Sequence, residues 1–375
     1  MSRIIEFLSW RHWGVIRYNS LWQNAAAVFY LALTHHLYSW GFLARVALFV
    51  LFSMLSTSYG YLVNDLADRE LDRRHGKPNV FTGMGGVRPL AVVGVTAVGA
   101  ALTGLPFLHR PWFALLWGAW FCVATFYSLP PLRFKERGLG GLTAAILAQQ
   151  TLPTLLIFAA FGHPASWGAL AFVVYATARG VSSDVGHQMR DWAHDAGTET
   201  PTFAVRRGYR SICRLYAACQ ELDKLLLGAV MVMLMVDLPS VSLPGLGLQA
   251  GLAWPLVAFY LVLYTLTAGQ AWKGLQQGAL SDPYDETPQG PERNAIHFIH
   301  HSFPSVVIPF YLAGWMTLFY RPNGVFVLAL ILLYRLYSPR RWAAAWPLRA
   351  FCTKVRQLIG VPEQELPLDE LARME

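Results

Sequence analysis

A short stretch of acidic residues follows a long apolar segment near the start of the chain. In Asn64-Asp65-Leu66-Ala67-Asp68-Arg69-Glu70-Leu71-Asp72, three aspartates are spaced three and four residues apart. On a helix this spacing places Asp65, Asp68 and Asp72 on one face. A charge inside a membrane helix costs about 2.5–3.5 kcal/mol, and clustered carboxylates commonly bind divalent cations. The stretch therefore predicts a cation site at the end of a membrane helix.

A second acidic run lies at residues 183–195, after another apolar segment. Its members Asp184, Gln188, Asp191 and Asp195 step by four, three and four residues, which again gives one helical face. The residues from Gly197 to Pro201 should end that helix. Oxygen ligands favour Mg²⁺ or Mn²⁺, and Mg²⁺ often completes its coordination with phosphate oxygens. Two such clusters together predict a site that binds a polyphosphate through bridging cations.

A basic loop follows a third apolar segment, in the sequence Tyr127-Ser128-Leu129-Pro130-Pro131-Leu132-Arg133-Phe134-Lys135. The two prolines should end the helix before them. Arg133 and Lys135 should then face the same side of the membrane as the acids, where they can bind phosphate oxygens. Taken alone, these charges are equally typical of an ordinary basic loop of a membrane protein.

The elements that position these residues are membrane helices. Of the 375 residues, 55% are hydrophobic and 14% are charged, so the sequence predicts an all-α, polytopic membrane bundle. It has nine transmembrane helices if the last two apolar segments form one broken span, and ten otherwise. These segments lie at 21–39, 43–63, 88–107, 111–129, 140–161, 166–183, 211–237, 249–270, 303–319 and 322–338.

The basic residues alternate between the two sides of the predicted bundle. They concentrate in the loops after the second, fourth, sixth and tenth segments, whereas the opposite loops hold little beyond Arg45, Arg110 and Arg321. The positive-inside rule then places both termini and the acidic motifs in the cytosol. The same loops account for the net charge of +8, so no nucleic-acid partner is expected. We expect a multi-pass protein of a bacterial inner membrane.

Three regions are predicted along the chain. Residues 1–20 combine arginines with large apolar residues, which is typical of an amphipathic helix on the membrane surface, and they lack the pattern of a cleavable signal peptide. Residues 21–338 form the transmembrane domain, and residues 339–375 form a cytosolic tail with a disordered acidic end. The loop Lys273–Arg293 is either a lid over the cytosolic face or a solvated linker.

Three smaller features have structural and functional interpretations. His297, His300 and His301 lie near Glu292 at helical spacing, so they could form a zinc site or an interfacial helix. Glu221 and Lys224 are spaced for a structural ion pair inside an apolar segment. The four cysteines lack metal or redox spacing and are expected to be free thiols.

The three motifs together resemble the UbiA superfamily of intramembrane prenyltransferases. NDLADRELD at Asn64–Asp72 matches the family pattern NDxxDxxxD, and YSLPPLRFK at Tyr127–Lys135 and DWAHD at Asp191–Asp195 follow in the family's order. The resemblance covers nearly the whole chain. One departure is that His194 stands where the family usually has glycine and that Gly197 follows Asp195 by only two residues, which leaves the acceptor subclass open.

The resemblance implies a fold, a reaction and roles for these residues. Residues 21–338 would form a UbiA-like bundle around a cavity open to lipid. A prenyl diphosphate would ionise there to an allylic cation, a lipophilic or aromatic acceptor would attack it, and diphosphate would leave. Asp65, Asp68, Asp191 and Asp195 would be catalytic. The Mg²⁺ ligands would be Asn64, Asp65, Asp68, Asp72, Asp191 and Asp195. Diphosphate would contact Asn64, Arg69, Lys77, Arg133 and Lys135. Further candidates are Tyr127, Asp184 and Gln188.

Two alternatives remain open from the sequence. A terpene cyclase of the same superfamily would use the same ionisation site but capture the cation with the substrate's own double bonds. An ion-coupled membrane transporter would use the carboxylates as an ion site and should show inverted repeats and broken helices near the middle of the membrane. The prenyl chain length, the acceptor and the oligomeric state are also open.

Overall fold

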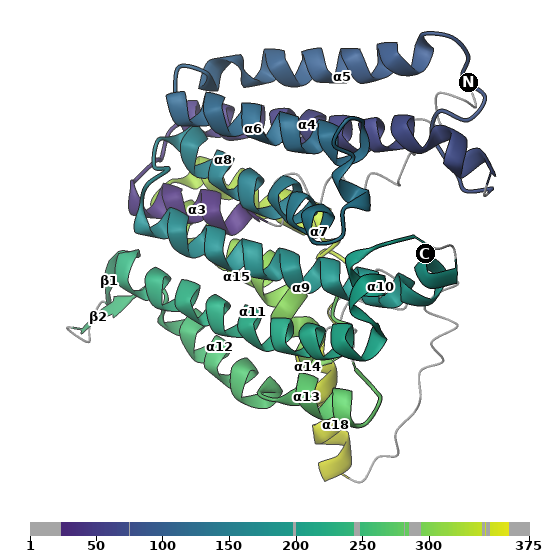
Figure 1. Ribbon diagram of the computed structural model, residues 1–375. Helices are drawn as coiled ribbons and strands as arrows, with labels where there is room; N and C mark the ends of the chain where they lie inside the picture. Colours follow the sequence, from purple (N-terminus) through teal and green to yellow (C-terminus); the bar gives the residue numbers. More distant parts are fainter. Residues whose placement is uncertain are drawn as a thin grey trace.

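The protein is a stack of helices with one small β-hairpin, as seen in a computed structural model (Figure 1). The structure describes residues 24–74, 76–197, 200–243, 248–280, 282–284, 294–339, 342 and 346–359. The predicted surface helix at 1–20, the acidic end of the tail and most of the loop at 281–293 lie outside these residues. The all-α class predicted from composition is confirmed for the described part of the chain.

The first acidic stretch belongs to a single long helix. After the short helix α3 (Ala25–Thr34), α4 runs from Trp40 to Arg74 over 35 residues. The apolar part buries aromatic side chains such as Phe42, Phe49 and Phe52, and the acidic residues occupy the last third of the same helix. Two arginines in the last turn compensate the negative end of the helix dipole.

Helix α6 packs beside α4 in the same direction. The chain crosses back through α5 (Arg88–Gly104) and η3 (Leu105–Phe107) before α6 begins at Pro111 and ends at Ser128. Along the contact between α4 and α6, the Tyr59 hydroxyl lies 2.7 Å from the Thr125 hydroxyl. The helix ends just before Pro130, as the two prolines predicted.

The second acidic run lies on another long helix, α9. It follows a continuous helical segment made of α7 (Leu139–Ile146), a π-helical turn η5 (Leu147–Thr151) and α8 (Leu152–Phe161). Helix α9 extends from Trp167 to Gly197, where the sequence predicted a break. The short helix α10 (Phe203–Arg207) then begins with the Thr202 side chain accepting a hydrogen bond from the Val205 amide.

Helix α11 (Tyr209–Asp237) lies against α9 and leads into the hairpin. Strands β1 (Ser240–Leu243) and β2 (Leu248–Gly251) pair antiparallel. The prediction of one helix over 249–270 was therefore wrong at its start, because α12 covers only Trp254–Thr267. The predicted loop from Lys273 also begins inside a helix, α13 (Gln270–Gln276).

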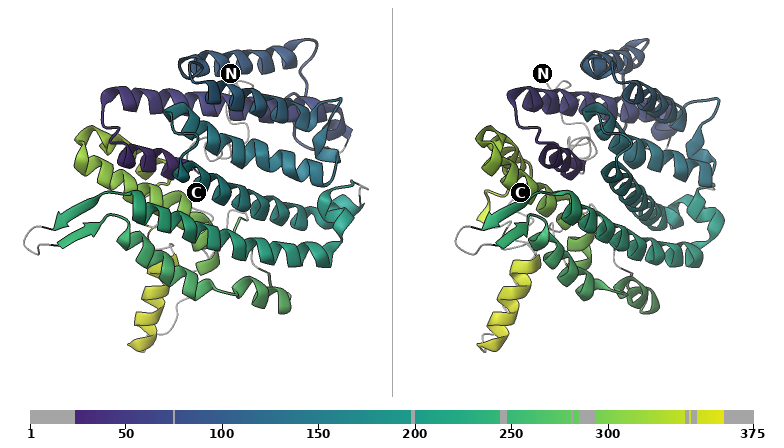
Figure 2. Two further views of the ribbon diagram at one scale, coloured as in Figure 1. Left: turned by 60° about the vertical axis from the view of Figure 1, so that its left-hand side comes forward. Right: turned by 90° about the vertical axis from the view of Figure 1, so that its left-hand side faces the viewer.

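The last apolar segments form a helix with a widened middle. It consists of α14 (Ala295–His297), the π-helical η6 (Phe298–Val307) and α15 (Ile308–Phe319). Pro304 lies inside η6 and removes one backbone donor from it. After η7 (Arg321–Asn323) come α16 (Gly324–Leu333) and α18 (Trp346–Leu358). Figure 2 shows α18, in yellow, projecting away from the other helices.

The helices run roughly side by side, so the bundle has two distinct ends. In Figure 1 the hairpin β1–β2 lies at the left end, whereas α10 and the end of α9 lie at the right end. By length and composition, four described helical stretches qualify as membrane spans: 40–74, 88–107, 139–161 and 295–319. The predicted count of nine or ten spans remains a prediction. All four cysteines are free thiols, as predicted.

Candidate functional site

The acidic end of α4 is fixed by an asparagine from the loop that follows it. Asp65 is only 5% exposed. The Asn79 side-chain amide donates to the Asp65 backbone carbonyl at 2.7 Å and to Asp72 Oδ2 at 2.8 Å. Asn79 Oδ1 accepts from the Phe81 amide at 3.0 Å. The loop thereby holds two turns of α4, and with them the shared face of Asp65 and Asp72, in one geometry.

Asn64 is oriented by the neighbouring helix. The Ser128 hydroxyl, on the last residue of α6, donates to Asn64 Oδ1 at 2.7 Å. Gly60, one turn earlier on α4, faces Trp120 and Ala124 of α6, and a β-carbon added there would lie 3.9 Å from each of them. The acidic motif and the basic loop are therefore joined at the point where α6 ends.

The basic loop places two cationic side chains on Asp68. Lys135 Nζ contacts Asp68 Oδ1, and the Arg133 guanidinium lies 3.6 Å from the same oxygen. Arg133 has φ +41°, a left-handed conformation that is uncommon for residues with a side chain. The chain turns back there into the short helix η4 (Phe134–Glu136). As a result, two residues from one loop reach a single carboxylate that is 15% exposed.

The acidic face of α9 is half-buried near Asp184 and exposed near Asp191. Asp184 accepts from the Gln188 side-chain amide at 2.9 Å, and Gln188 Oε1 in turn accepts from the Ala204 amide at the start of α10. Asp191 is 51% exposed and lies 3.6 Å from His187. The Asp195 backbone carbonyl accepts from the Thr200 amide, which closes the helix end.

Tyr127 connects the two acidic helices. Its phenol lies within electrostatic range of Asp184 on α9 and of Asp68 on α4. Tyr127 is the residue before the last one of α6, so α6 ends between the two carboxylates. Asp184 is therefore the member of the predicted second acidic cluster that lies near Tyr127, on the side of the α4 cluster.

Two residues predicted to contact the diphosphate, Arg69 and Lys77, make no contact with the acidic side chains that the structure describes. The Arg69 guanidinium donates to the Met84 carbonyl, and the Lys77 side chain is exposed and contacts no carboxylate among the described residues. Within those residues, no three His, Cys, Asp or Glu side chains converge as a metal-binding group. The donor chemistry nevertheless fits Mg²⁺, since it consists of carboxylates and an amide. Asp68 also already attracts the positive charge of Lys135.

The sequence profile of the UbiA prenyltransferase family matches residues 21–283. The chain belongs to this family. The resemblance seen in the three motifs is thereby confirmed, and the protein is an integral membrane protein with the helical fold of the UbiA family.

Known relatives of this UbiA family member match at different levels. A lycopene elongase/hydratase of Halobacterium salinarum is 35% identical over 94 residues, which cover 24% of this chain and 33% of that protein. The match thus spans one third of that relative's length. A UbiA homolog from Archaeoglobus fulgidus bound to DMAPP and Mg²⁺ has a TM-score of 0.52, and the same homolog bound to GPP and Mg²⁺ has 0.53. Each structure is 16% identical and covers 80% of this chain and 96% of its own, which shows a shared fold.

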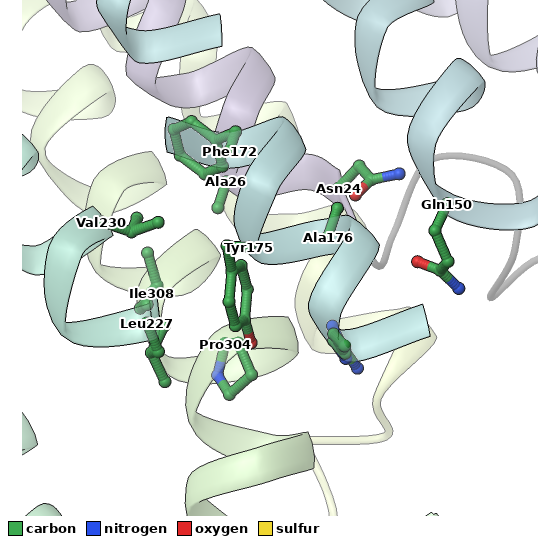
Figure 3. Close-up of a pocket in the computed structure, with 11 residues that line it drawn as sticks. Asn24, Ala26, Gln150, Phe172, Tyr175, Ala176, Leu227, Val230, Pro304 and Ile308 are labelled. Carbon is green, nitrogen blue, oxygen red and sulfur yellow. The ribbon is translucent and has the colours of Figure 1, made fainter. Parts of the chain in front are cut away.

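A cavity of this UbiA protein lies among α3, η5, α9, α11, η6 and the start of α15. Figure 3 shows residues that line it, with Leu227 and Ile308 on the left and Gln150 on the right. Its polar groups are Asn24, Gln150, Tyr175 and Arg179. Ala176 of α9 also lines the cavity and precedes Asp184 by two turns, about 12 Å along the helix axis. The cavity is therefore within reach of a ligand whose polar end lies at the acidic site.

Sequence reasoning missed several residues of this site. Asn79 lies in an ordinary polar loop, and only its contacts with α4 reveal its role. The sequence groups His300 with two other histidines as a zinc candidate or part of an interfacial helix. The structure instead buries His300 against Asp223, 3.0 Å away on α11, so the interfacial interpretation was wrong for it. Glu221 and Lys224 form the predicted ion pair at 2.9 Å.

Proposed function

We propose that this protein is an Mg²⁺-dependent intramembrane prenyltransferase that moves an isoprenoid group from a prenyl diphosphate to a lipophilic or aromatic acceptor. The observation that carries the proposal is the arrangement around Asp68. Two cationic side chains meet this carboxylate, and the Tyr127 phenol lies within electrostatic range of both Asp68 and Asp184 on the second acidic helix. Acidic and basic groups at one point form the kind of site that a diphosphate with its counterions requires.

The proposed metal ligands are the oxygens of Asn64, Asp65, Asp68, Asp72, Asp191 and Asp195. Bound Mg²⁺, or Mn²⁺ in its place, would neutralise the charge that develops on the departing diphosphate. Asn79 and Ser128 keep the α4 part of this set in a fixed geometry before any substrate arrives. Such preorganisation removes a cost that substrate binding would otherwise have to meet.

The basic loop has the role of holding the diphosphate. In the absence of substrate, Lys135 and Arg133 contact Asp68. When the carboxylate engages a cation, both side chains are near enough to turn to phosphate oxygens, for which a guanidinium and an ammonium are suited. Positive charge from this loop stabilises the leaving group as the allylic C–O bond breaks.

We place the hydrocarbon part of the prenyl diphosphate along this cavity, whose volume of about 20 Å³ requires the surrounding helices to move apart when substrate binds. The cavity wall is mainly apolar, so it excludes the water that would quench an allylic cation. The rings of Phe172 and Tyr175 line it, and aromatic faces stabilise cations. A lipophilic acceptor can reach such a cavity from the membrane, and we expect it to attack the allylic carbon there.

The acceptor is best identified by product analysis. The purified protein is incubated with Mg²⁺, with dimethylallyl, geranyl or geranylgeranyl diphosphate, and with either lycopene, a phenol or a lipid extract. Lycopene is included because the Halobacterium relative is named as a lycopene elongase/hydratase. A prenylated acceptor supports the proposal, whereas a cyclic hydrocarbon formed without acceptor would favour a terpene cyclase.

The site itself is tested with matched carboxylate variants of α4. Asp65→Asn and Asp68→Asn should abolish Mg²⁺-dependent diphosphate release. Glu70→Gln is the control, because Glu70 lies on the same helix but pairs with Arg73 and Arg74 on an exposed surface. Full activity in both aspartate variants would contradict the proposed function, and equal loss in Glu70→Gln would point to a folding defect instead.

A further inference from the structure

A second polar cluster is buried beside the cavity, away from the acidic motifs. It joins Asp223 of α11, His300 of η6 and Tyr284, which come from three separate parts of the chain. The side chains of Asp223 and His300 are each 1% exposed. His300 Nδ1 lies 3.0 Å from Asp223 Oδ2, and the Tyr284 hydroxyl donates to the same oxygen. Ionisable groups inside a membrane protein are costly and usually serve a function.

One ring nitrogen of His300, Nδ1, lies within hydrogen-bond distance of Asp223, and the other, Nε2, has no hydrogen-bond partner among the described residues. Asp223 Oδ1 and His300 Nε2 are buried and have no hydrogen-bond partner among the described residues. Leaving such an atom unsatisfied costs about 1–3 kcal/mol. Burial and the neighbouring Asp223 raise the pKa of the Tyr284 phenol well above its ordinary value, so the phenol stays protonated and donates. An imidazole whose Nδ1 faces a carboxylate and whose Nε2 is free can accept a proton.

The cluster adjoins the proposed reaction cavity. Leu227 and Pro304 both line the cavity, and each lies four residues after a member of the cluster, Asp223 on α11 and His300 in η6. The Tyr284 phenol is also within electrostatic range of the cavity residues Tyr175 and Arg179. His300 and Asp223 therefore each lie about one helical turn from a residue that lines the cavity.

We propose that His300, oriented by Asp223, accepts the proton released in the prenyl-transfer reaction. This inference rests on the proposed function. The allylic C–O bond breaks, and its electron pair leaves on the diphosphate. The acceptor's π electrons form the new C–C bond, and a C–H bond of the resulting cation then breaks. Its electron pair forms a C=C bond, and its proton moves to Nε2 of His300. Without acceptor, the prenyl cation itself loses the proton and becomes a conjugated hydrocarbon.

Other charged and titratable groups surround this base and bear on its pH dependence. On α11 they include Asp223 itself and the ion pair of Glu221 with Lys224, whose ammonium also donates to the Thr267 carbonyl at 2.7 Å. Cys219 also lies on α11. The remaining groups come from α9, α12, the segment at 282–284 and the histidine's own helix. They are Tyr175, Arg179, Tyr260, Tyr284, His297 and His301.

The test follows the fate of the prenyl cation with geranyl diphosphate and Mg²⁺ as the probes and no acceptor. A cation that loses a proton gives an acyclic triene, whereas one that captures water gives an alcohol. In His300→Gln we expect diphosphate release to continue within about threefold, while the ratio of triene to alcohol falls by about 100-fold. His297→Gln, which removes another histidine from the same helix, should keep the ratio of the unchanged protein.

A pH profile separates a base from a merely structural residue. In the unchanged protein, the ratio of triene to alcohol should fall as the pH is lowered, because a protonated imidazole accepts no further proton. In His300→Gln the ratio should be low and flat with pH. Asp223→Asn, which leaves the imidazole in place but removes its carboxylate, should lower the ratio by about tenfold. It also provides the measurement if His300→Gln does not fold.

Three outcomes would overturn the assignment. The first is an unchanged ratio in His300→Gln, or in Asp223→Asn if only that variant folds. The second is a loss of diphosphate release in step with triene, which indicates a structural role. The third is diphosphate release without triene in the unchanged protein. An unchanged protein that releases no diphosphate at all contradicts the proposed function as well, so the two failures are distinguishable.

Discussion

Asp68 is a carboxylate that basic side chains from a distant part of the chain contact. It lies between its own helix and a loop 65–67 residues further along, from which Arg133 and Lys135 approach. Both contacts are partly shielded from water, so they are stronger than exposed surface ion pairs. A metal cation could therefore take the place of the Lys135 ammonium or the Arg133 guanidinium at Asp68.

Removing the Lys135 ammonium should weaken substrate binding. Because a hydrogen bond to a charged group contributes about 1.5–3 kcal/mol, Lys135→Ala should lower kcat/KM for the prenyl diphosphate by about 10–150-fold. Lys135→Arg should restore part of the loss. The control is Arg74→Ala, since Arg74 is exposed and pairs only with Glu70 among the described residues. An unchanged kcat/KM in Lys135→Ala would exclude a role for Lys135 in diphosphate binding.

Asn79 should matter for both stability and metal affinity. Asn79→Ala removes two hydrogen bonds to α4 and leaves the buried part of the helix less fixed. We expect a loss of about 1–3 kcal/mol in the free energy of unfolding and a weaker Mg²⁺ dependence of diphosphate release. Thermal unfolding and an Mg²⁺ titration measure the two effects. A normal Mg²⁺ titration in the variant would show that the loop does not support the cation site.

At the residue scale, the sequence predicted which residues share a helix face but not which distant residues contact that face. The spacing of Asp65, Asp68 and Asp72 is enough to place them together on a helix. Nothing local indicates that Asn79 would contact that face, or that Asp184 would be less exposed than Asp191 in the second run. Those outcomes depend on how the loop and α10 fold back, which is determined by contacts distant in sequence.

The long helices α4 and α9 carry the site, and the close packing of α9 against α11 depends on a glycine. On α9, Gly186 lies between Asp184 and Gln188. A β-carbon at Gly186 would lie 2.8 Å from the ring of Tyr216 on α11, and this ring is fully buried. The distance between α9 and α11 at the level of the acidic residues is therefore set by the absence of a side chain.

Gly186→Ala should separate α9 from α11 and destabilise the protein. We expect a loss of about 1–3 kcal/mol from overpacking, with a shift of Asp184 that lowers diphosphate release. Gly118→Ala on α6 is the matched control. A β-carbon there meets open space, so the change should be neutral or stabilising. Equal thermal stability of the two variants would contradict the tight contact at Gly186.

Helix ends were easier to predict from sequence than helix interiors. Pro130 and Gly197 mark the ends of α6 and α9, because proline and glycine act locally on the backbone. Proline also lies inside η6 and just after η5, but it does not by itself distinguish a π-helical turn from a kink or a helix end. The strands β1 and β2 flank a Pro-Gly pair at 244–245, a turn signal that the predicted helix from residue 249 does not take into account. Which structure forms at these places depends on packing against neighbouring helices, which a single sequence does not specify.

For the whole molecule, metal and substrate should stabilise the fold together. Chelation by EDTA should abolish diphosphate release, and Mg²⁺ or Mn²⁺ should restore it. A prenyl diphosphate at about 100 times its Kd, with Mg²⁺, should add about 2.7 kcal/mol to the free energy of unfolding. Asp68→Asn should show no such gain. A thermal shift without metal would mean that the diphosphate binds through the basic loop alone.

The global arrangement was predictable only in outline. Composition was enough for a helical membrane protein, and the order of three motifs was enough for the family. The pairing of Asp223 with His300 joins positions 77 residues apart. It depends on the register of η6 against α11, which no local pattern encodes.

We expect the length of α4 to couple the proposed reaction to the lipid around it. Its 35 residues extend about 52 Å, whereas the hydrocarbon core of a bilayer is about 30 Å thick. This one continuous helix is therefore long enough to extend from the membrane interior to carboxylates beyond the hydrocarbon core. Changing the acyl-chain length of the surrounding lipids should tilt α4 and shift the carboxylates relative to the headgroups. The turnover of the proposed reaction should therefore depend on bilayer thickness and be highest at one acyl-chain length.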